Sequence, residues 1–162
     1  FSITLKVNGR FIDSYINGYW GADNMPKKEI IKVDKLKTLV GGTWRMADGE
    51  PNLSTATKFG NLVFLAGQTG THPITGELGV GVREQTQFTL ERIKMILESV
   101  GTSLDNVLSV TSYLTKREDL AAYNEEYGRY FTKDKPARAT VEVMLNRPEL
   151  LVEIMVTACI PD

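Results

Sequence analysis

The sequence predicts one α+β domain in which two amphipathic helices cover one face of a mixed β-sheet. The main observation is the order strand, strand, helix, strand, helix, strand, strand over residues 52–160, which is typical of helices layered on a sheet. The helical segments place apolar residues three and four positions apart, whereas the strand segments are short and rich in β-branched residues. The chain has 162 residues, which is enough for one domain with a sizeable core.

The first three elements follow from apolar runs and the glycines that end them. Residues 54–59 form a short polar segment, and residues 62–66 form the continuous apolar run of a buried strand. The glycine-rich segment 67–70 is expected to break that strand, and a loop should follow over residues 71–80. A helix is expected over residues 82–100, since its aliphatic residues fall on one stripe.

The second half of the domain predicts a strand, a helix and two further strands. Residues 107–114 are β-branched and aromatic, and residues 119–131 form a helix that carries several aromatic side chains. Pro136 opens a strand that runs to Met144, and a final strand covers residues 150–160. This last strand is apolar on both faces, so its second face needs a cover. Another subunit is a natural cover in a chain of this size.

Residues 1–51 carry weaker signals and are predicted to be an N-terminal extension of unknown role, followed by the domain at 52–162. Residues 3–7 alternate like a strand and precede an Asn8–Gly9 turn. Met25 is a plausible natural start, which would make residues 1–24 an appendage.

Composition excludes several classes of protein. The 19 basic and 20 acidic residues give a net charge of -1, which argues against a protein whose main task is to grip a nucleic-acid backbone. No stretch reaches the roughly 20 apolar residues of a membrane span, so no membrane partner is expected. The single cysteine, Cys159, cannot form a disulfide within the chain and fits a reducing, cytoplasmic location. One histidine, His72, and no metal-ligand spacing argue against a metal site.

Arg138 and Glu153 are the strongest candidates for chemistry. Arg138 enters an otherwise apolar strand, where it either reaches solvent or presents a guanidinium fork to a substrate carboxylate. Glu153 interrupts the apolar last strand, and a carboxylate in such a place needs a partner or a function. It is either a structural ion-pair partner, with Arg138 as one possibility, or a general acid/base with a raised pKa.

Three further positions carry a weaker signal. Gly67 ends the buried strand and either allows close approach of a ligand or serves a turn. Thr140 lies two residues after Arg138 and so faces the same side of its strand, where it either packs or binds a ligand. Asn124 reads most simply as a solvated helix residue. His72 is expected to be a surface residue, and Cys159 and the helix aromatics are expected to be core residues.

The region after residue 51 resembles the RidA/YjgF/UK114 family of reactive-intermediate deaminases. The resemblance spans about residues 52–160 in the order and spacing of the family. It is carried by 60–68 (GNLVFLAGQ) with 73–78 (PITGEL), 101–107 (GTSLDNV) with 123–127 (YNEEY) and 130–131 (YF), and 136–143 (PARATVEV) with 151–154 (LVEI).

The resemblance implies a chorismate-mutase-like fold and a homotrimer with active sites between subunits. It implies hydrolysis of 2-imino or 2-enamino acids to 2-oxo acids and ammonia, with a small-molecule substrate and without a cofactor. Arg138 matches the arginine that binds the substrate carboxylate, and Glu153 matches the glutamate that activates water. Gly67 and Asn124 match residues that line the site, and Thr140 stands where many members have cysteine.

Three departures from the family pattern bear on substrate choice. Leu53 replaces a frequent tyrosine, Ala66 replaces a frequent serine, and Thr140 replaces the cysteine. The C-terminal half is also similar to 2-aminomuconate deaminases, which act on a longer dicarboxylate. The alternatives to imine hydrolysis are therefore a 2-aminomuconate-type deaminase, an endoribonuclease or translation-inhibitor-like protein that acts on RNA, and a non-catalytic protein that binds a small ligand.

Overall fold

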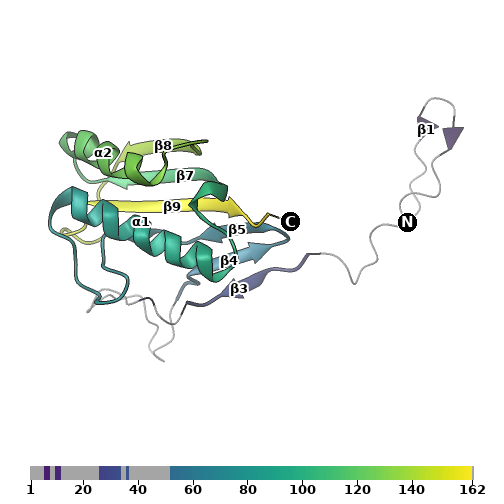
Figure 1. The fold of residues 1–162 in the computed structure, drawn as a ribbon, viewed down its shortest axis with the longest axis horizontal. Coiled ribbons are helices and arrows are strands. Elements are labelled where there is room, and N and C mark those ends of the chain that lie inside the picture. The colour runs from purple at the N-terminus through teal and green to yellow at the C-terminus, as the bar shows by residue number, and fades with distance from the viewer. Residues whose placement is uncertain (1–5, 8–9, 12–25, 34–35, 37–51, 162) are drawn as a thin grey trace.

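A computed structural model describes residues 6–7, 10–11, 26–33, 36 and 52–161 (Figure 1). Its strands are β1 (Lys6–Val7), β2 (Arg10–Phe11), β3 (Glu29–Ile31), β4 (Ala56–Phe59), β5 (Leu62–Leu65), β6 (Gln68–Thr69), β7 (Val107–Leu114), β8 (Ala137–Glu142) and β9 (Val152–Cys159). The two α-helices are α1 (Gly81–Ser99) and α2 (Leu120–Tyr130), with short 3-10 turns at Leu104–Asn106 and Arg117–Asp119.

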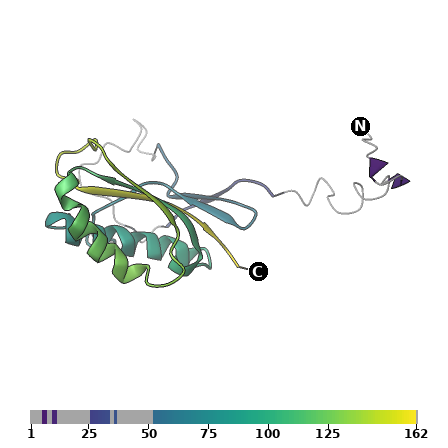
Figure 2. The same ribbon diagram turned by 90° about the horizontal axis from the view of Figure 1, so that it is seen from above.

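The main sheet is mixed and has the order β3-β4-β5-β9-β7-β8, with β6 also paired to β9. Its neighbours pair antiparallel except β7 and β8, which are parallel because α2 carries the chain back across the sheet. Both helices lie on the same side of the sheet (Figure 2). The predicted layer architecture is therefore confirmed, and β8 is an edge strand of the sheet.

Alternation along β9 divides the sheet into two faces. Val152, Ile154, Val156 and Ala158 are buried against the helices, where Leu90, Ile93 and Ile96 of α1 are fully buried. The residues between them point to the opposite face, where Met155 is 40% exposed. We call these the covered face and the open face. Burying apolar side chains on the covered face supplies the main driving force for folding.

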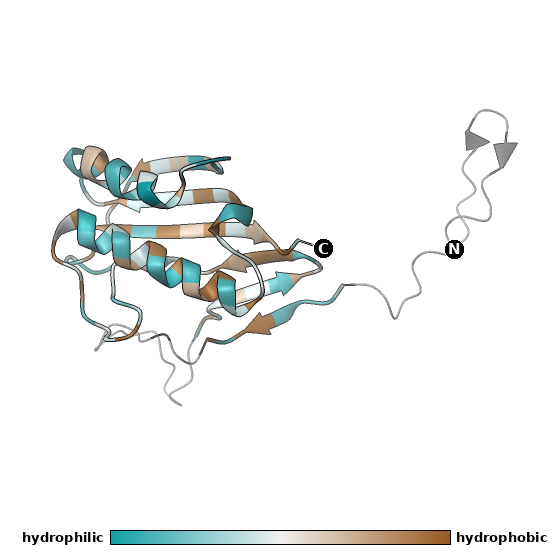
Figure 3. Ribbon diagram, viewed as in Figure 1, coloured by the Kyte–Doolittle hydropathy of each residue, from teal (hydrophilic) through white to brown (hydrophobic). Residues whose placement is uncertain are grey.

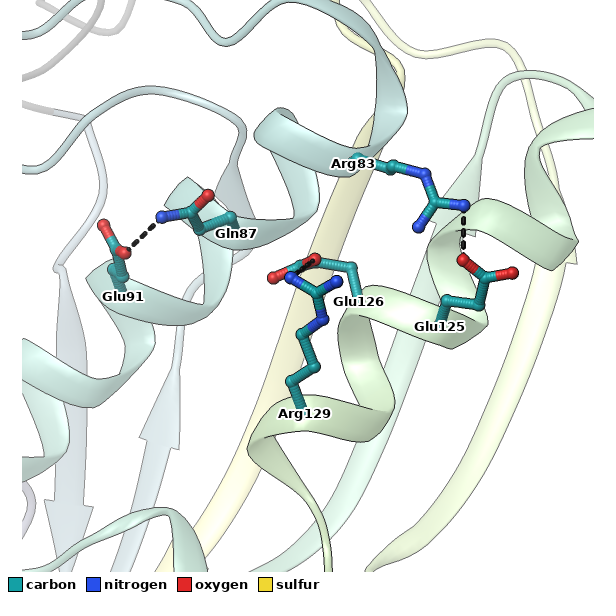
Figure 4. A network of polar contacts seen from close by, with 6 residues as sticks. All are labelled: Arg83, Gln87, Glu91, Glu125, Glu126 and Arg129. Carbon is teal, nitrogen blue, oxygen red and sulfur yellow. Dashed lines mark hydrogen bonds and ion pairs between the residues drawn. The ribbon is translucent and has the colours of Figure 1, made fainter.

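The helices have a polar outer surface that also joins them to each other. Figure 3 shows mainly hydrophilic residues on the exposed side of α1. Arg83 of α1 forms an ion pair with Glu125 of α2, and the buried carboxylate of Glu126 lies 3.1 Å from Arg129 (Figure 4). The Arg83–Glu125 pair joins the two helices, whereas the Glu126–Arg129 pair lies within α2, and Asn124 lies beside Glu125 on that helix. No helix in the described part of the chain has the length and apolar character needed to cross a membrane.

The strand and helix bounds agree closely with prediction. The buried strand β5 ends at Leu65, as the expected break at residues 67–70 requires, but the prediction missed a second short strand within that segment. Gln68 and Thr69 form β6, which pairs with Ile154 and Glu153 of β9. The glycines on both sides hide this strand in the sequence, because its pairing partner lies more than 80 residues away. The reason is that tertiary pairing overrides local turn signals.

Three of the described strands, β1, β2 and β3, lie in the predicted extension. β3 pairs with β4 and adds a strand at the edge of the main sheet. β1 and β2 pair with each other through Lys6–Phe11 and Val7–Arg10, which agrees with the predicted reversal of the chain. The Asn8–Gly9 turn and the remainder of 1–24 lie outside the described residues. The domain boundary at residue 52 stays a prediction.

Candidate active site

Arg138 and Asn124 meet where β8 lies against α2. The Arg138 Nη2 atom donates a hydrogen bond to Asn124 Oδ1 at 2.8 Å. The guanidinium also stacks over Tyr127, with its central carbon 4.5 Å from the ring centroid, and lies 5.4 Å from the centroid of Tyr123. Cation–π contacts and a side-chain amide hold the guanidinium in one orientation. Asn124 is exposed, as the sequence-based reading expected, and its amide oxygen also orients Arg138.

The tyrosines under Arg138 belong to both the core and the site. Tyr123 is fully buried, and its hydroxyl lies 2.6 Å from Ser112 Oγ of β7. Burial raises the pKa of Tyr123 and raises that of Tyr127 to about 12, so both phenols stay neutral at physiological pH. The Tyr127 hydroxyl is buried without a hydrogen-bond partner among the described residues.

A surface hollow of about 340 Å³ opens beside this group. It is lined by Asn124, Tyr127, Gly128, Phe131, Lys135, Pro136 and Arg138. Sequence reasoning missed Tyr127 and Lys135 as site residues. Tyr127 lies three residues after Asn124 in the helix, so the two side chains share one helix face. This spacing could have identified Tyr127 from the sequence. Lys135 comes from the turn that precedes β8 and had no such signal.

Thr140 shares the face of Arg138, as its spacing predicts. Arg138 is in register with Val110 and Thr140 with Ser112, and both of these β7 residues are buried on the covered face. The Thr140 Oγ1 atom is buried and has no hydrogen-bond partner among the described residues. It therefore adds a second unused polar atom to this side of the strand.

A β-bulge sets the direction of the residues around Gly67. Phe64 is in register with Thr157, and Gln68 is in register with Ile154, so four steps along β5–β6 match three steps along β9. The extra residue turns Gln68 to the covered face. There Gln68 is buried and accepts a hydrogen bond at 3.2 Å from Arg92 Nε of α1, whose pKa burial lowers to about 10.

Gly67 lies in this bulge, directly under the carboxylate of Glu153. A Cβ atom at Gly67 would lie 1.9 Å from Glu153 Oε1, so any larger residue would displace the carboxylate. The glycine therefore leaves room for the Glu153 carboxylate in the position that it occupies. Desolvation raises the pKa of Glu153, as the sequence predicted for a carboxylate in an apolar strand.

Arg138 and Glu153 lie on opposite faces of the sheet. Glu153 is in register with Tyr113, and Tyr113 is in register with Val141. Val141 is three residues from Arg138, and an odd separation along a strand reverses the face. The Arg138–Glu153 ion pair that the sequence allowed is thus excluded within one chain. Glu153 faces the open side, whereas Arg138 faces α2.

His72 and Cys159 do not line the hollow beside Arg138. His72 Nδ1 accepts hydrogen bonds from the backbone N–H groups of Ile74 and Thr75, and its ring packs edge-on against Phe88. Cys159 is a free, half-buried thiol. In the described ranges, no three His, Cys, Asp or Glu side chains gather where they could hold a metal ion.

Comparison with known proteins identifies the family. The profile of the endoribonuclease L-PSP family, the group that includes YjgF and RidA, matches residues 47–160. The chain belongs to the YjgF/RidA family. The predicted resemblance is thereby confirmed, and this family membership covers the whole region that forms the sheet from β4 to β9 together with both helices.

Several members of the YjgF/RidA family are similar in sequence and fold. A RutC family protein of Pyrococcus horikoshii is 47% identical over 102 residues, which cover 62% of this chain and 81% of that protein. RidA of an Antarctic Psychrobacter is 34% identical, with a TM-score of 0.70 over 82% of this chain and 99% of that one. TdcF of Escherichia coli, solved with bound serine, is 26% identical, with a TM-score of 0.68 over 81% and 98% of the two chains.

Proposed function

We propose that this protein hydrolyses 2-imino and 2-enamino acids to 2-oxo acids and ammonia without a cofactor. The observation that carries the proposal is a guanidinium held in place beside an open hollow, together with a desolvated glutamate on the other face of the sheet. Family membership supports the general activity, since TdcF is named as a candidate reactive intermediate deaminase. The serine bound to TdcF is a small amino acid with the same α-carboxylate.

Arg138 would bind the carboxylate of the substrate. Its planar fork suits a bidentate carboxylate, and Asn124 and Tyr127 already hold it in one orientation. A charge-assisted hydrogen bond of this kind contributes about 1.5–3 kcal/mol. The Thr140 hydroxyl, which is buried on the same side of β8 and has no hydrogen-bond partner among the described residues, would lie close to the bound carboxylate.

Glu153 would move the proton during hydrolysis. The Glu153 carboxylate takes a proton from water while the water oxygen bonds to C2 and the C=N π electrons pass to nitrogen. The Glu153 carboxyl group then gives this proton to the nitrogen, which forms a neutral carbinolamine. Glu153 next takes the hydroxyl proton and passes it to the amine, so that ammonia leaves with the C2–N electron pair as the C2–O bond becomes a carbonyl. A 2-enamino acid enters this sequence after it gains a proton at C3 and loses one from nitrogen. A raised pKa lets one carboxyl group accept and return this proton near neutral pH.

We further propose that the active site forms between copies of the chain in a homotrimer. Arg138 and Glu153 face opposite sides of the sheet in one chain, so a site with both needs the open face of one copy near β8 of another. The open face carries the exposed apolar side chains of Phe64 and Met155. Assembly would cover these side chains. A reducing location such as the cytoplasm fits the free thiol of Cys159.

A competition assay tests the activity. An amino-acid oxidase generates 2-imino acids in the presence of semicarbazide, and the protein competes for the imine before semicarbazide traps it. We expect the wild type to suppress trapping. Glu153→Gln should reduce this suppression by about 10²-fold or more, and Arg138→Ala by about 10–100-fold.

Two exposed residues of the Arg117–Asp119 turn provide matched controls. Arg117→Ala and Glu118→Gln remove the same kinds of charge outside the site and should leave the rate unchanged. A wild type that suppresses trapping of no imino acid would overturn the proposal. The endoribonuclease in the family description is less well supported here, because the net charge of -1 provides no general attraction for RNA.

A further inference from the structure

Lys135 is fixed at the hollow by the backbone on both sides of it. Asp134 has φ of 41°, in the left-handed region, and is the only residue other than glycine with positive φ in the described part of the chain. Pro136 follows, and a proline restricts the preceding residue to extended conformations. The turn from α2 to β8 therefore directs Lys135 without help from side-chain contacts. Non-glycine residues with positive φ are concentrated at functional positions.

The charge of the hollow exceeds what one carboxylate would balance. Its seven lining residues include two cations, Lys135 and Arg138, and no acidic residue. Arg138 is already oriented by Asn124 and the two tyrosines. Lys135 is exposed and takes part in none of the ion pairs formed among the described residues. A substrate with one carboxylate would use Arg138 and leave the Lys135 ammonium without a counter-charge.

The shape and chemistry of the hollow suit a longer substrate. Its volume of about 340 Å³ falls within the range of small-ligand sites, roughly 300–1,000 Å³. The lining of the hollow also includes the apolar residues Phe131 and Pro136. Lysine is a flexible point charge and can reach an anion at variable distance, whereas arginine imposes a planar geometry. The pair therefore combines one rigid and one adjustable carboxylate-binding group.

We propose that Lys135 binds a second anionic group of the substrate, so that dicarboxylic 2-imino acids are preferred over monocarboxylic ones. This inference rests on the proposed function and specifies its substrate class. The Arg138 fork binds the α-carboxylate beside the imine, and Lys135 binds the carboxylate at the other end of the molecule.

A pair of substrates tests this inference directly. Imines are generated from glutamate and from norvaline, which have the same chain length but differ in the terminal carboxylate. We expect the wild type to hydrolyse the glutamate imine with a higher kcat/KM. Lys135→Gln should lower kcat/KM for this imine roughly two- to fivefold, the range of an exposed ion pair, and leave kcat/KM for the norvaline imine unchanged. Lys135→Arg should retain the preference.

Lys133→Gln is the matched control, because Lys133 is an exposed lysine of the same turn that does not line the hollow. It should change neither rate. An equal loss for both imines with Lys135→Gln, or no preference in the wild type, would overturn the inference.

A binding measurement separates this inference from the proposed function. The stable acids 2-oxoglutarate and 2-oxopentanoate are titrated into wild type and Lys135→Gln by calorimetry. Tighter binding of 2-oxoglutarate that is lost in Lys135→Gln supports the Lys135 subsite even if neither imine is hydrolysed, in which case only the catalytic proposal fails. Equal binding of the two acids by the wild type contradicts the subsite.

Discussion

The covered and open faces of the sheet use the same strand for different purposes. On the covered face, β9 contributes Ile154 and Val156 to a core that the helices close. On the open face, the intervening residues include the desolvated carboxylate of Glu153 and the exposed side chain of Met155. Because side chains alternate along a strand, one eight-residue segment carries both stability and a catalytic candidate.

The two faces also differ in what completes them. The covered face has its helices within the chain, and Arg138 is held there by α2. The open face has no such layer within the described residues, although it carries Glu153. A site that joins both residues therefore depends on association, whereas the core does not. The comparison between the faces predicts which substitutions affect folding and which affect assembly and catalysis.

The largest expected effect on stability comes from neighbouring residues of β9. Ile154→Ala should lower the free energy of unfolding by about 2–5 kcal/mol, because the side chain is 0% exposed and its removal leaves a cavity. Met155→Ala removes a side chain that is 40% exposed in the single chain, so its direct cost should be below about 1 kcal/mol. Urea denaturation with a fixed protein concentration measures both.

Sedimentation of the same two variants sharpens the comparison. Met155→Ala should weaken the association of the copies more than Ile154→Ala does. The comparison is made at a temperature at which the Ile154→Ala variant is still folded. Equal effects of the two variants on association would contradict the assignment of the open face as the interface.

The next effect is on activity and tests whether the site is shared. Arg138→Ala and Glu153→Ala chains are mixed in equal amounts, unfolded together and refolded. If each site takes Arg138 from one copy and Glu153 from another, about one quarter of the sites regain both residues. The imine competition assay should then show activity that neither variant has alone. Absence of restored activity, with the refolded mixture assembled, would indicate that the site is not divided in this way.

The smallest effect concerns pH and depends on the desolvation of Glu153. Its pKa in the folded chain is raised above the ordinary value of 4.5, so the folded state holds this proton more strongly than the unfolded state. The resulting stability is fully present below pH 4.5 and is lost as pH rises through the raised pKa. The Glu153→Gln variant has no proton to lose at this position. Its free energy of unfolding should therefore rise relative to that of the wild type as the pH increases from 4.5 through the raised pKa of Glu153.

Urea denaturation of both proteins from pH 4 to pH 8 measures this difference. Glu118→Gln, at an exposed glutamate, should show no such trend. A difference between Glu153→Gln and wild type that stays constant with pH would mean that the carboxylate is solvated in the folded protein.

Much of the fold could be predicted because its signals are local. The apolar stripe of α1 and the β-branched residues of β7 lie within the elements that they predict, so no distant part of the chain is needed to recognise them. The bounds predicted for β7 are those that the structure has. β6 could not be predicted in this way. Its two residues are a strand only because β9 lies beside them, and the bulge that precedes them depends on the same pairing.

The site was predictable in its residues but not in its arrangement. Arg138 and Glu153 stand out as charged residues in apolar strands, and Thr140 follows from strand spacing. Asn124 was recognised through the family resemblance alone. Tyr127 and Lys135 emerged only from the packing of α2 and of the turn before β8.

The sequence by itself determined the order of the elements, the layer architecture, the family and the two main candidates for chemistry. These depend on residue type and on spacing along the chain, which are visible without coordinates. Only the tertiary structure decided that Gly67 makes room for the Glu153 carboxylate and that Arg138 and Glu153 face opposite sides. Both facts depend on strand register, which long-range hydrogen bonds between β6, β7, β8 and β9 set.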